Sequence, residues 1–267
     1  MPLTSVNHPI GIPFIELESI DSTNNYALAQ IHANLAQPGT CYFAHNQTAG
    51  KGQRGKSWIS EKEANIILSI ALKPEFLQAF QQFHLSACVA VATHFFLSSY
   101  TDYNLKIKWP NDLYWKDRKL GGILIENIVG GLSGIDLGPD GIDASSAWKW
   151  AIIGIGINNN QAEFPDALKN PVSIKQITGK NYQSAGLAKE LCKTIEDSYN
   201  KLITDGPGST MEYYNQALYK KDEVVKFKKD ARSFEAKVKS VSQTGQLIVQ
   251  HAIEEQFDFG EVEWVIS

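Results

Sequence analysis

The sequence predicts an α+β protein of two parts: a larger domain of helices and strands over residues 1–220, and a small β-barrel over residues 221–267. Two observations lead to this prediction. In the first part, segments with apolar residues at helical spacing alternate with nearly continuous apolar runs, which are typical of buried strands. From Glu223 on, short alternating segments are separated by glycine turns such as Thr244-Gly245, a pattern typical of a small all-β unit.

Composition limits the classes of function. The chain has 267 residues, with 25 Lys and Arg against 29 Asp and Glu, so its formal net charge is −4. This balance argues against nucleic-acid binding driven by bulk charge. No apolar run approaches the roughly 20 residues of a membrane span, and no secretory signal is visible. Cys41, Cys88 and Cys192 lie far apart in apolar surroundings, which predicts reduced core cysteines rather than a disulfide or zinc site.

Helices are expected in the first part only. Ser22 or Thr23 can cap the first helix, in which Leu28, Ile31 and Leu35 recur at helical spacing. The expected helices span residues 22–35, 76–100 (broken near its start), 183–203 and 210–218.

Strands are expected at residues 40–45, 66–72, 105–109, 113–116, 122–128 and 148–157, and in the barrel at 223–227, 233–241, 246–250 and 262–266. The first fourteen residues, with their prolines and a glycine, predict an irregular lead-in. Gly130–Ala147, rich in Gly, Ser and Asp, predicts a long loop.

A glycine-rich basic loop spans Gln47–Trp58. Its glycines (Gly50, Gly52 and Gly55) would let backbone N–H groups approach an anion, and its cations (Lys51, Arg54 and Lys56) would neutralise it. The loop therefore predicts phosphate binding, with a flexible basic surface hairpin as the alternative. A P-loop is not expected, because a strand rather than a helix should begin at Trp58. The indole of Trp58 would pack in the core or stack on a base.

Two lysines flank a second motif. Pro110-Asn111-Asp112 predicts a turn between strands, and pairing of these strands would bring Lys108 and Lys119 close together. Two ammonium groups repel each other unless an anion lies between them. Asp112 could orient one of the lysines or accept a proton; a solvated hairpin with scattered lysines is the alternative.

Two further segments suit a polar, flat ligand. The alternation in Ile153-Gly154-Ile155-Gly156-Ile157 puts its glycines on one strand face, where a ligand or a closely packed helix can lie against the backbone. At the start of the first helix, Asp21-Ser22-Thr23-Asn24-Asn25 offers hydroxyl, amide and N–H groups that suit a ureido head. Helix capping alone is the alternative.

The order of these motifs resembles that of the biotin–protein ligases. The resemblance rests on Asp21-Ser22-Thr23-Asn24, the loop ending in Trp58, Lys108-Trp109-Pro110-Asn111-Asp112, Lys119-Leu120-Gly121-Gly122-Ile123-Leu124-Ile125-Glu126 and Gly154-Ile155-Gly156-Ile157-Asn158. It spans residues 21–158 and continues weakly to the C-terminus. It implies a fold like that of class II aminoacyl-tRNA synthetases: a mixed, mostly antiparallel sheet flanked by helices, followed by an SH3-like β-barrel.

The resemblance implies a ligase that converts biotin and ATP to biotinyl-5′-AMP and transfers biotin to a lysine of a biotin carboxyl carrier protein, of acetyl-CoA carboxylase or a related carboxylase. Mg²⁺ would come with ATP, held mainly by phosphates and water, with no metal site of the protein's own. The chain is similar to the monofunctional type without an N-terminal DNA-binding domain. We therefore expect a cytoplasmic enzyme with no DNA or membrane partner; a homodimer would fit the family.

The match also implies roles for single residues. Lys119, Asp112 and Lys108 are expected at the catalytic step. The expected biotin-binding residues are Ser22, Thr23, Asn24, Gln47, Lys51, Gly52, Gln53, Lys119, Gly122, Gly154 and Gly156. The expected ATP-binding residues are Gly50, Lys51, Arg54, Gly55, Lys56, Trp58, Asn111 and Asn158.

The loop departs from the family pattern, which usually has arginines where this chain has Lys51, Gln53 and Lys56. Lysine lacks the planar fork of a guanidinium, and Gln53 carries no charge, which should weaken closure of the loop over the adenylate. Alternatives to a biotin ligase are a lipoate or octanoate ligase or transferase of the same superfamily, a non-catalytic biotin or nucleotide sensor, and a nucleic-acid-binding module using the barrel.

Overall fold

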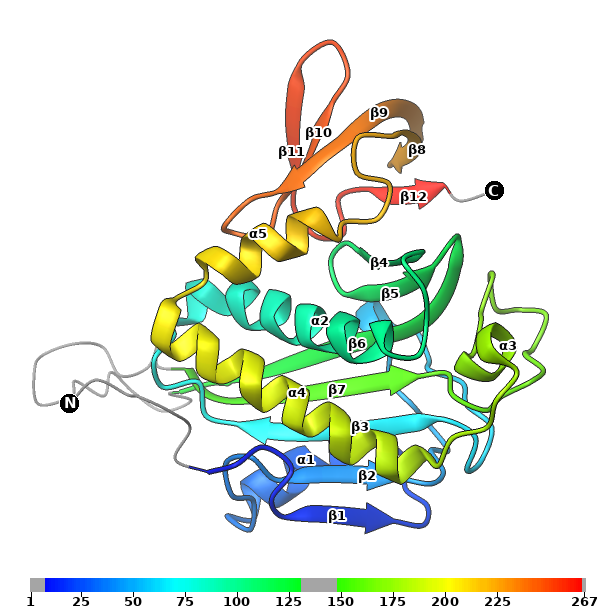
Figure 1. Cartoon of the computed structure of the whole chain (residues 1–267). Helices are drawn as coiled ribbons and strands as arrows, with labels where there is room; N and C mark the ends of the chain where they lie inside the picture. The colour runs from blue at the N-terminus through cyan, green and yellow to red at the C-terminus, as the bar shows by residue number, and fades with distance from the viewer. Residues whose placement is uncertain (1–7, 131–147, 266–267) are drawn as a thin grey trace, which may run out of the picture.

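The structure, a computed structural model, describes residues 8–130 and 148–265 and contains two β-sheets (Figure 1). The larger sheet has seven strands in the order β1-β2-β3-β7-β6-β5-β4, and the smaller has five in the order β11-β10-β9-β8-β12. Among the described strands, β1 and β2 pair in parallel and all other pairs are antiparallel. The predicted α+β class, with a mixed, mostly antiparallel sheet flanked by helices, is therefore confirmed.

The elements have the following bounds. The larger sheet consists of β1 (Phe14–Leu17), β2 (Cys41–Ala44), β3 (Ile66–Leu72), β4 (Leu105–Lys108), β5 (Asp112–Trp115), β6 (Arg118–Val129) and β7 (Trp148–Ile157). The smaller sheet consists of β8 (Val224–Lys229), β9 (Arg232–Val241), β10 (Leu247–Gln250), β11 (Glu254–Phe257) and β12 (Glu263–Val265). The helices are α1 (Thr23–His32), α2 (Gln82–Ser98), α3 (Ile174–Thr178), α4 (Ser184–Asp205) and α5 (Gly208–Gln216).

The centre of the larger sheet is formed by β3 and β7, which pair from Ile66–Ile157 to Leu72–Ala151. Every residue of β3 is buried, because α2 and α4 cover one face of the sheet and α1 packs on the other (Figure 1). A strand covered on both faces needs apolar residues on both, so β3 and β7 appear in the sequence as continuous apolar runs and begin and end at the predicted residues.

Three elements are absent from the sequence prediction. β1 begins at the last residue of the expected irregular lead-in and is a four-residue edge strand with two exposed residues. α3 has five residues, too few to show a helical period. β11 (Glu-Glu-Gln-Phe) is polar apart from its last residue. The expected loop Gly130–Ala147 lies almost wholly outside the described residues, and the expected break before α2 is confirmed by a 3₁₀ turn at Ala79–Gln81.

The smaller sheet is joined to the larger one by hydrogen bonds near the β4–β5 turn. Trp109 Nε1 donates to the carbonyl of Gly245 over 2.8 Å. Asn215 of α5 donates to the carbonyl of Val241 and accepts from its N–H. In the same region, the buried Tyr214 donates its hydroxyl to the carbonyl of Pro110 over 2.6 Å. These bonds hold the turn that leads into Asp112. The domain boundary predicted between residues 220 and 221 precedes β8 and stays a prediction.

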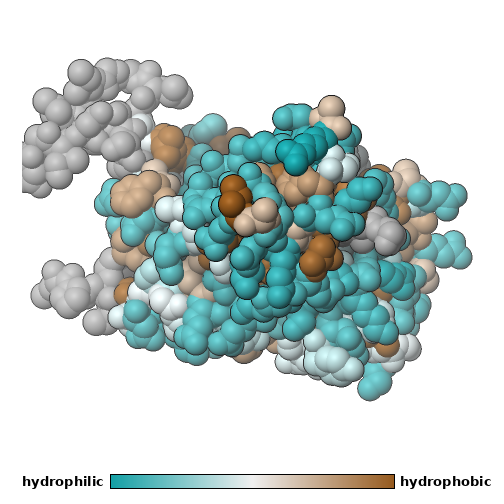
Figure 2. Space-filling model, turned by 90° about the horizontal axis from the view of Figure 1, so that it is seen from above, coloured by the Kyte–Doolittle hydropathy of each residue, from teal (hydrophilic) through white to brown (hydrophobic). Residues whose placement is uncertain are grey.

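The surface seen from above in Figure 2 is mostly polar, with apolar residues in small, separate patches. Cys41, Cys88 and Cys192 are free and buried, as the sequence predicts. Burial, together with the neighbouring Cys192, raises the pKa of the Cys41 thiol. None of the described helices is both long enough and apolar enough to cross a membrane.

We predict that Tyr214→Phe lowers the free energy of unfolding by about 1–3 kcal/mol, because the substitution leaves the buried carbonyl of Pro110 without its donor. Urea denaturation followed by circular dichroism measures this change. Tyr103→Phe, at a side chain that is 87% exposed, is the matched control and should have no effect. Equal stability of the two variants would contradict the role assigned to this bond.

Candidate active site

The strand register gathers the predicted site residues on the α1 face of the larger sheet. Lys108 of β4 pairs with Asp112 of β5, Asp112 pairs with Gly122 of β6, and Gly122 pairs with Gly156 of β7. Paired residues of neighbouring strands project from the same face of a sheet. One row across four strands therefore contains a lysine, a carboxylate and two glycines.

Lys119 joins this row through an ion pair. Its Nζ lies 2.7 Å from Asp112 Oδ1. A Cβ on Gly122 would lie only 3.0 Å from that oxygen and 3.2 Å from Nζ. The missing side chain of Gly122 thus makes room for the pair. The predicted geometry, with a carboxylate among two lysines brought together by strand pairing, is confirmed.

The Lys108 ammonium is less hydrated than that of an ordinary lysine. Its pKa falls to about 8, mainly because of burial; Lys119 and Lys56 lower it further, while Asp112 partly offsets the effect. The ammonium lies 4.9 Å from the ring centroid of Tyr114 and 5.6 Å from that of Trp264. Lys108 is therefore a cation whose charge is easily lost.

A polar cluster lies at the start of α1. Thr23 donates both its N–H and its hydroxyl to Gln47 Oε1, over 2.7 and 3.1 Å. Ser69 Oγ lies 2.7 Å from Thr23 Oγ1 and 2.5 Å from Asn24 Oδ1. Since a hydroxyl has one proton, it can donate to only one of the two. Asn24 also donates to Glu126 over 2.7 Å. The cluster therefore holds several donors and acceptors that can be rearranged around a polar head group.

The expected capping role of Ser22 is wrong in one respect. Ser22 occupies the N-cap position of α1, but its side chain makes no capping hydrogen bond. The N–H of Thr23 donates instead to the side-chain amide oxygen of Gln47. The start of the helix is thus tied to the strand side of the site rather than capped locally.

The two glycines of β7 have close neighbours. A Cβ on Gly154 would lie 2.4 Å from Asn24 Oδ1, and a Cβ on Gly156 would lie 2.5 Å from Trp58 Cε2. The predicted bare strand face is therefore present, but Asn24 and the Trp58 indole lie against it. Trp58 Nε1 is buried without a hydrogen-bond partner. The indole centroid lies 6.0 Å from Lys119 Nζ.

The glycine-rich loop covers a cavity of about 460 Å³ (lined by Ala49, Gly50, Lys51, Gly52, Arg54, Gly55, Lys56, Ser57, Leu124 and Glu126). Gly50–Ser57 matches the P-loop pattern letter by letter, but it contains only a 3₁₀ turn at Gln53–Gly55 and a bridge between Lys51 and Ser57. No helix begins directly after Ser57, so the loop is not a P-loop, as predicted. The strand expected from Trp58 is also absent.

The side chains of this loop are tethered in different directions. Lys51 forms an ion pair with Glu126 over 3.4 Å. Arg54 donates to the carbonyl of Gly260 in the smaller sheet's last turn over 3.1 Å, and Gln53 contacts the carbonyl of Ile123 at 3.5 Å. Lys56 is exposed. The loop therefore spans from the polar cluster to the C-terminal sheet.

The two predicted nucleotide-binding asparagines are buried in backbone contacts. Asn158 donates to the carbonyls of Lys119 and Val172, over 3.3 and 3.0 Å, so it holds the strand that carries Lys119. Asn111 donates to the carbonyl of Ile123 over 2.6 Å, while its Oδ1 is buried without a partner. That oxygen is available to accept a hydrogen bond.

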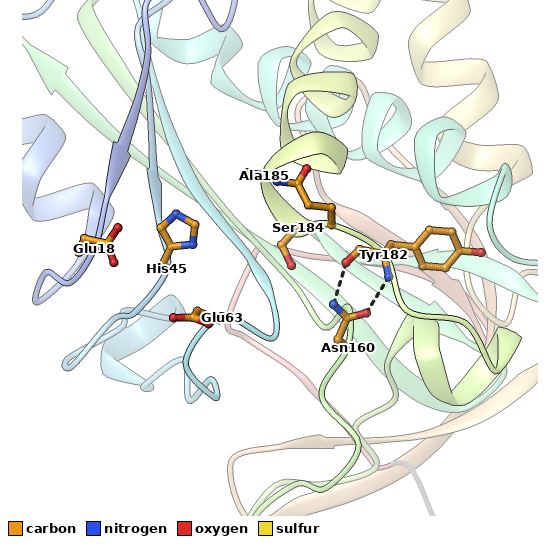
Figure 3. A pocket seen from close by; sticks show the side chains of 8 residues that line it. Glu18, His45, Glu63, Asn160, Tyr182, Ser184 and Ala185 are labelled. Carbon is orange, nitrogen blue, oxygen red and sulfur yellow. Dashed lines mark hydrogen bonds between the residues drawn. The ribbon is translucent and has the colours of Figure 1, made fainter.

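Ser69 and Glu126 belong to the site but are missing from the sequence prediction. Ser69 is the one polar residue of β3, and Glu126 directly follows the apolar segment Ile123–Ile125 of β6; these positions could have identified both. A separate cavity of about 290 Å³ is lined by Glu18, His45, Glu63, Asn160, Tyr182, Gln183, Ser184 and Ala185 (Figure 3). None of the predicted site residues lines it.

We predict that Gly156→Ala displaces the Trp58 indole, because the added methyl group would overlap the ring. Subtracting the fluorescence spectrum of a Trp58→Phe background isolates the emission of Trp58, which should shift to the red as the ring enters water. Gly208→Ala is the control, since nothing lies within 4 Å of its added Cβ. An unchanged Trp58 spectrum in Gly156→Ala would refute the contact.

The chain is similar to known proteins both in sequence and in fold. Residues 16–134 match the model of the Biotin/lipoate A/B protein ligase family. Over 201 residues the chain is 32% identical to the bifunctional ligase/repressor BirA of Bacillus spizizenii, covering 74% of this chain and 57% of the relative. It is 30% identical over 171 residues to a biotin–[acetyl-CoA-carboxylase] ligase of Paracoccus denitrificans, covering 61% of this chain and 63% of the relative. The chain thus spans little more than half the length of these curated relatives.

Solved structures show the same fold. The biotin protein ligase of Aquifex aeolicus in complex with biotin and ATP matches with a TM-score of 0.75 and 24% identity, over 95% of this chain and 98% of that one. This likeness shows the fold, while the match to the family model and the sequence relatives show that residues 16–134 belong to a domain of the biotin/lipoate A/B protein ligase family.

Proposed function

We propose that this chain is a biotin–protein ligase, which activates biotin with ATP to biotinyl-5′-AMP and transfers the biotin to a lysine of a biotin carboxyl carrier protein. One observation carries the proposal. The Lys119–Asp112 pair and the polar cluster at Thr23, Asn24 and Ser69 lie on one face of the sheet, beside a cationic glycine-rich loop. The sheet thus offers a polar head site and a site for anions side by side.

In the first half-reaction, a biotin carboxylate oxygen attacks the α-phosphorus of ATP, and pyrophosphate leaves. Both reactants are anions, so the barrier falls where cations and N–H donors meet the charge that builds up in the transition state. Lys119 is the residue assigned to this place, with Lys108 as the second cation. Lys51, Arg54 and Lys56, with the backbone N–H groups of the loop glycines, would hold the phosphates.

The biotin ring would lie at the other end of this face. The ureido group offers two N–H donors and one carbonyl acceptor, which suit the hydroxyl and amide groups of Thr23, Asn24 and Gln47. Bare backbone at Gly154 would lie against the ring. Trp58, over Gly156, lies between the ring end and Lys119 and would line the path toward the nucleotide.

In the second half-reaction, the carrier lysine amine attacks the acyl carbon of biotinyl-5′-AMP. An amide bond forms, the bond from the acyl carbon to the phosphate oxygen breaks, and AMP leaves. The attacking nitrogen loses its proton in this step, and Asp112 is the carboxylate assigned to orient the amine or take that proton.

A polar cluster of this kind favours biotin over lipoate or octanoate. A dithiolane ring or an alkyl chain has no donors for Asn24 Oδ1 or Gln47 Oε1, so its binding would gain none of the hydrogen bonds that a ureido group can make with these atoms. We therefore expect ATP–pyrophosphate exchange with biotin and not with the other two acids.

The metal ion, the cellular compartment and the partners of the enzyme are also proposals. Mg²⁺ would enter with ATP, held mainly by phosphates and water, because the carboxylates of Asp112 and Glu126 are each paired with a lysine. We place the enzyme in the cytoplasm, with the carrier protein as its macromolecular substrate. A homodimer and the lack of DNA binding stay predictions, to be tested by sedimentation and by a salt-dependent gel shift.

We predict that Lys119→Ala lowers biotin-dependent ATP–pyrophosphate exchange by about 100-fold or more, because it removes the cation nearest the reacting anions. Circular dichroism should show an intact fold. Lys62→Ala, at an exposed lysine, should exchange at the wild-type rate. An active Lys119→Ala protein would remove the catalytic assignment.

We also predict that Gln53→Arg slows the release of biotinyl-5′-AMP, because a guanidinium restores a loop charge that can hold the adenylate phosphate. Filter binding of radiolabelled adenylate measures the release rate. Gln53→Lys separates the effect of charge from that of the planar fork. Release from Gln53→Arg as fast as from the parent would show that this position does not govern closure.

A further inference from the structure

The Lys108 ammonium lies between two aromatic rings that come from different sheets. Tyr114 of β5 lies on the same sheet face, with its ring centroid 4.9 Å from Nζ. Trp264 of β12 approaches from the smaller sheet, at 5.6 Å. Within the described residues, no carboxylate forms an ion pair with Lys108; Asp112, whose charge stabilises this ammonium, is paired with Lys119. The two rings therefore stabilise the ammonium alongside Asp112.

The position of Trp264 is fixed by the C-terminal sheet. Its ring packs on Phe227 of β8, with 4.9 Å between centroids, and on Tyr219, at 5.7 Å. Tyr219 donates its hydroxyl to Asp117, which lies between β5 and β6. Trp264 Nε1 is buried without a hydrogen-bond partner, so the indole is held by ring packing rather than by its polar atom. The indole thus follows the placement of the smaller sheet.

We propose that Trp264 is a positioning residue of the active site: with Tyr114 it encloses the Lys108 ammonium and sets the charge of this cation for the adenylation step. The catalytic role given to Lys108 here rests on the proposed ligase function. Through Trp264, the C-terminal sheet becomes part of the site that binds the anions.

The enclosure has two opposing effects on Lys108. The π-faces stabilise the ammonium. Burial by the same rings, with the positive charges of Lys119 and Lys56, destabilises it, while Asp112 stabilises it; the balance gives a pKa of about 8. A lowered pKa means that the cation is present below about pH 8 and is lost above it. If the cation is needed, kcat/KM for adenylation falls as the pH rises through this value.

The test is the pH dependence of kcat/KM for biotin-dependent ATP–pyrophosphate exchange in the full chain. Trp264→Leu keeps an apolar side chain, although a smaller one, and removes the π-face, so the pH at which kcat/KM falls should move down by about half a pH unit. Trp264→Ala admits water, so the pH at which kcat/KM falls should move up. Trp264→Phe should stay close to wild type. Lys108→Arg, which remains charged, should lack this fall and thus assign it to Lys108.

A control variant and a second measurement, which does not depend on turnover, complete the test. Val265→Ala, at an exposed neighbour of Trp264 on β12, should leave the pH profile unchanged. Competitive labelling with trace acetic anhydride, read by mass spectrometry, follows the titration of Lys108 without turnover. Shifts in this titration without exchange activity would uphold the enclosure and contradict the ligase function. A Lys108 titration identical in wild type, Trp264→Leu and Trp264→Ala would overturn the proposal, whatever the activity.

Discussion

The ion pair between Lys119 and Asp112, set over a strand position without a side chain, is the interaction on which the site depends. Lys108 of β4 and Lys119 of β6, on either side of β5, would repel each other, and the Asp112 carboxylate of β5, 2.7 Å from Lys119, relieves that repulsion. One carboxylate does not neutralise two ammonium groups, so a positive excess remains on this sheet face. The proposed reaction of two anions requires such an excess, and Gly122 leaves room for the ion pair that holds Lys119 there.

The sheet supplies this arrangement through its topology. In an antiparallel sheet, the β4–β5 and β5–β6 pairings place residues that are apart in sequence into one row. The helices α2 and α4 cover the opposite face, so the site face is left to α1, the glycine-rich loop and the smaller sheet (Figure 1). The start of α1 adds the polar cluster, and Arg54 links the loop to the C-terminal sheet through Gly260. The glycine-rich loop and the C-terminal sheet are therefore connected directly.

Features that local chemistry determines can be predicted from the amino-acid sequence. Buried strands such as β3 and β7 appear as apolar runs, and the Lys108–Asp112–Lys119 geometry follows from a turn between paired strands. Features that depend on distant contacts are missed. Nothing in the segment around Trp58 shows that its indole lies on Gly156, and nothing around Trp264 shows that it faces Lys108. The short polar strand β11 and the edge strand β1 are missed because their pairing, and not their own residues, makes them strands.

The central claim is that this sheet face receives a polar ring at one end and joins two anions at the other. A crystal structure of the protein with biotin and a non-hydrolysable ATP analogue tests it most directly. The account predicts the ureido ring against Asn24 and Gly154, and the Lys119 ammonium between the biotin carboxylate and the α-phosphate. Ligands bound in the cavity beside His45, or Lys119 turned to solvent with both ligands in place, would contradict it.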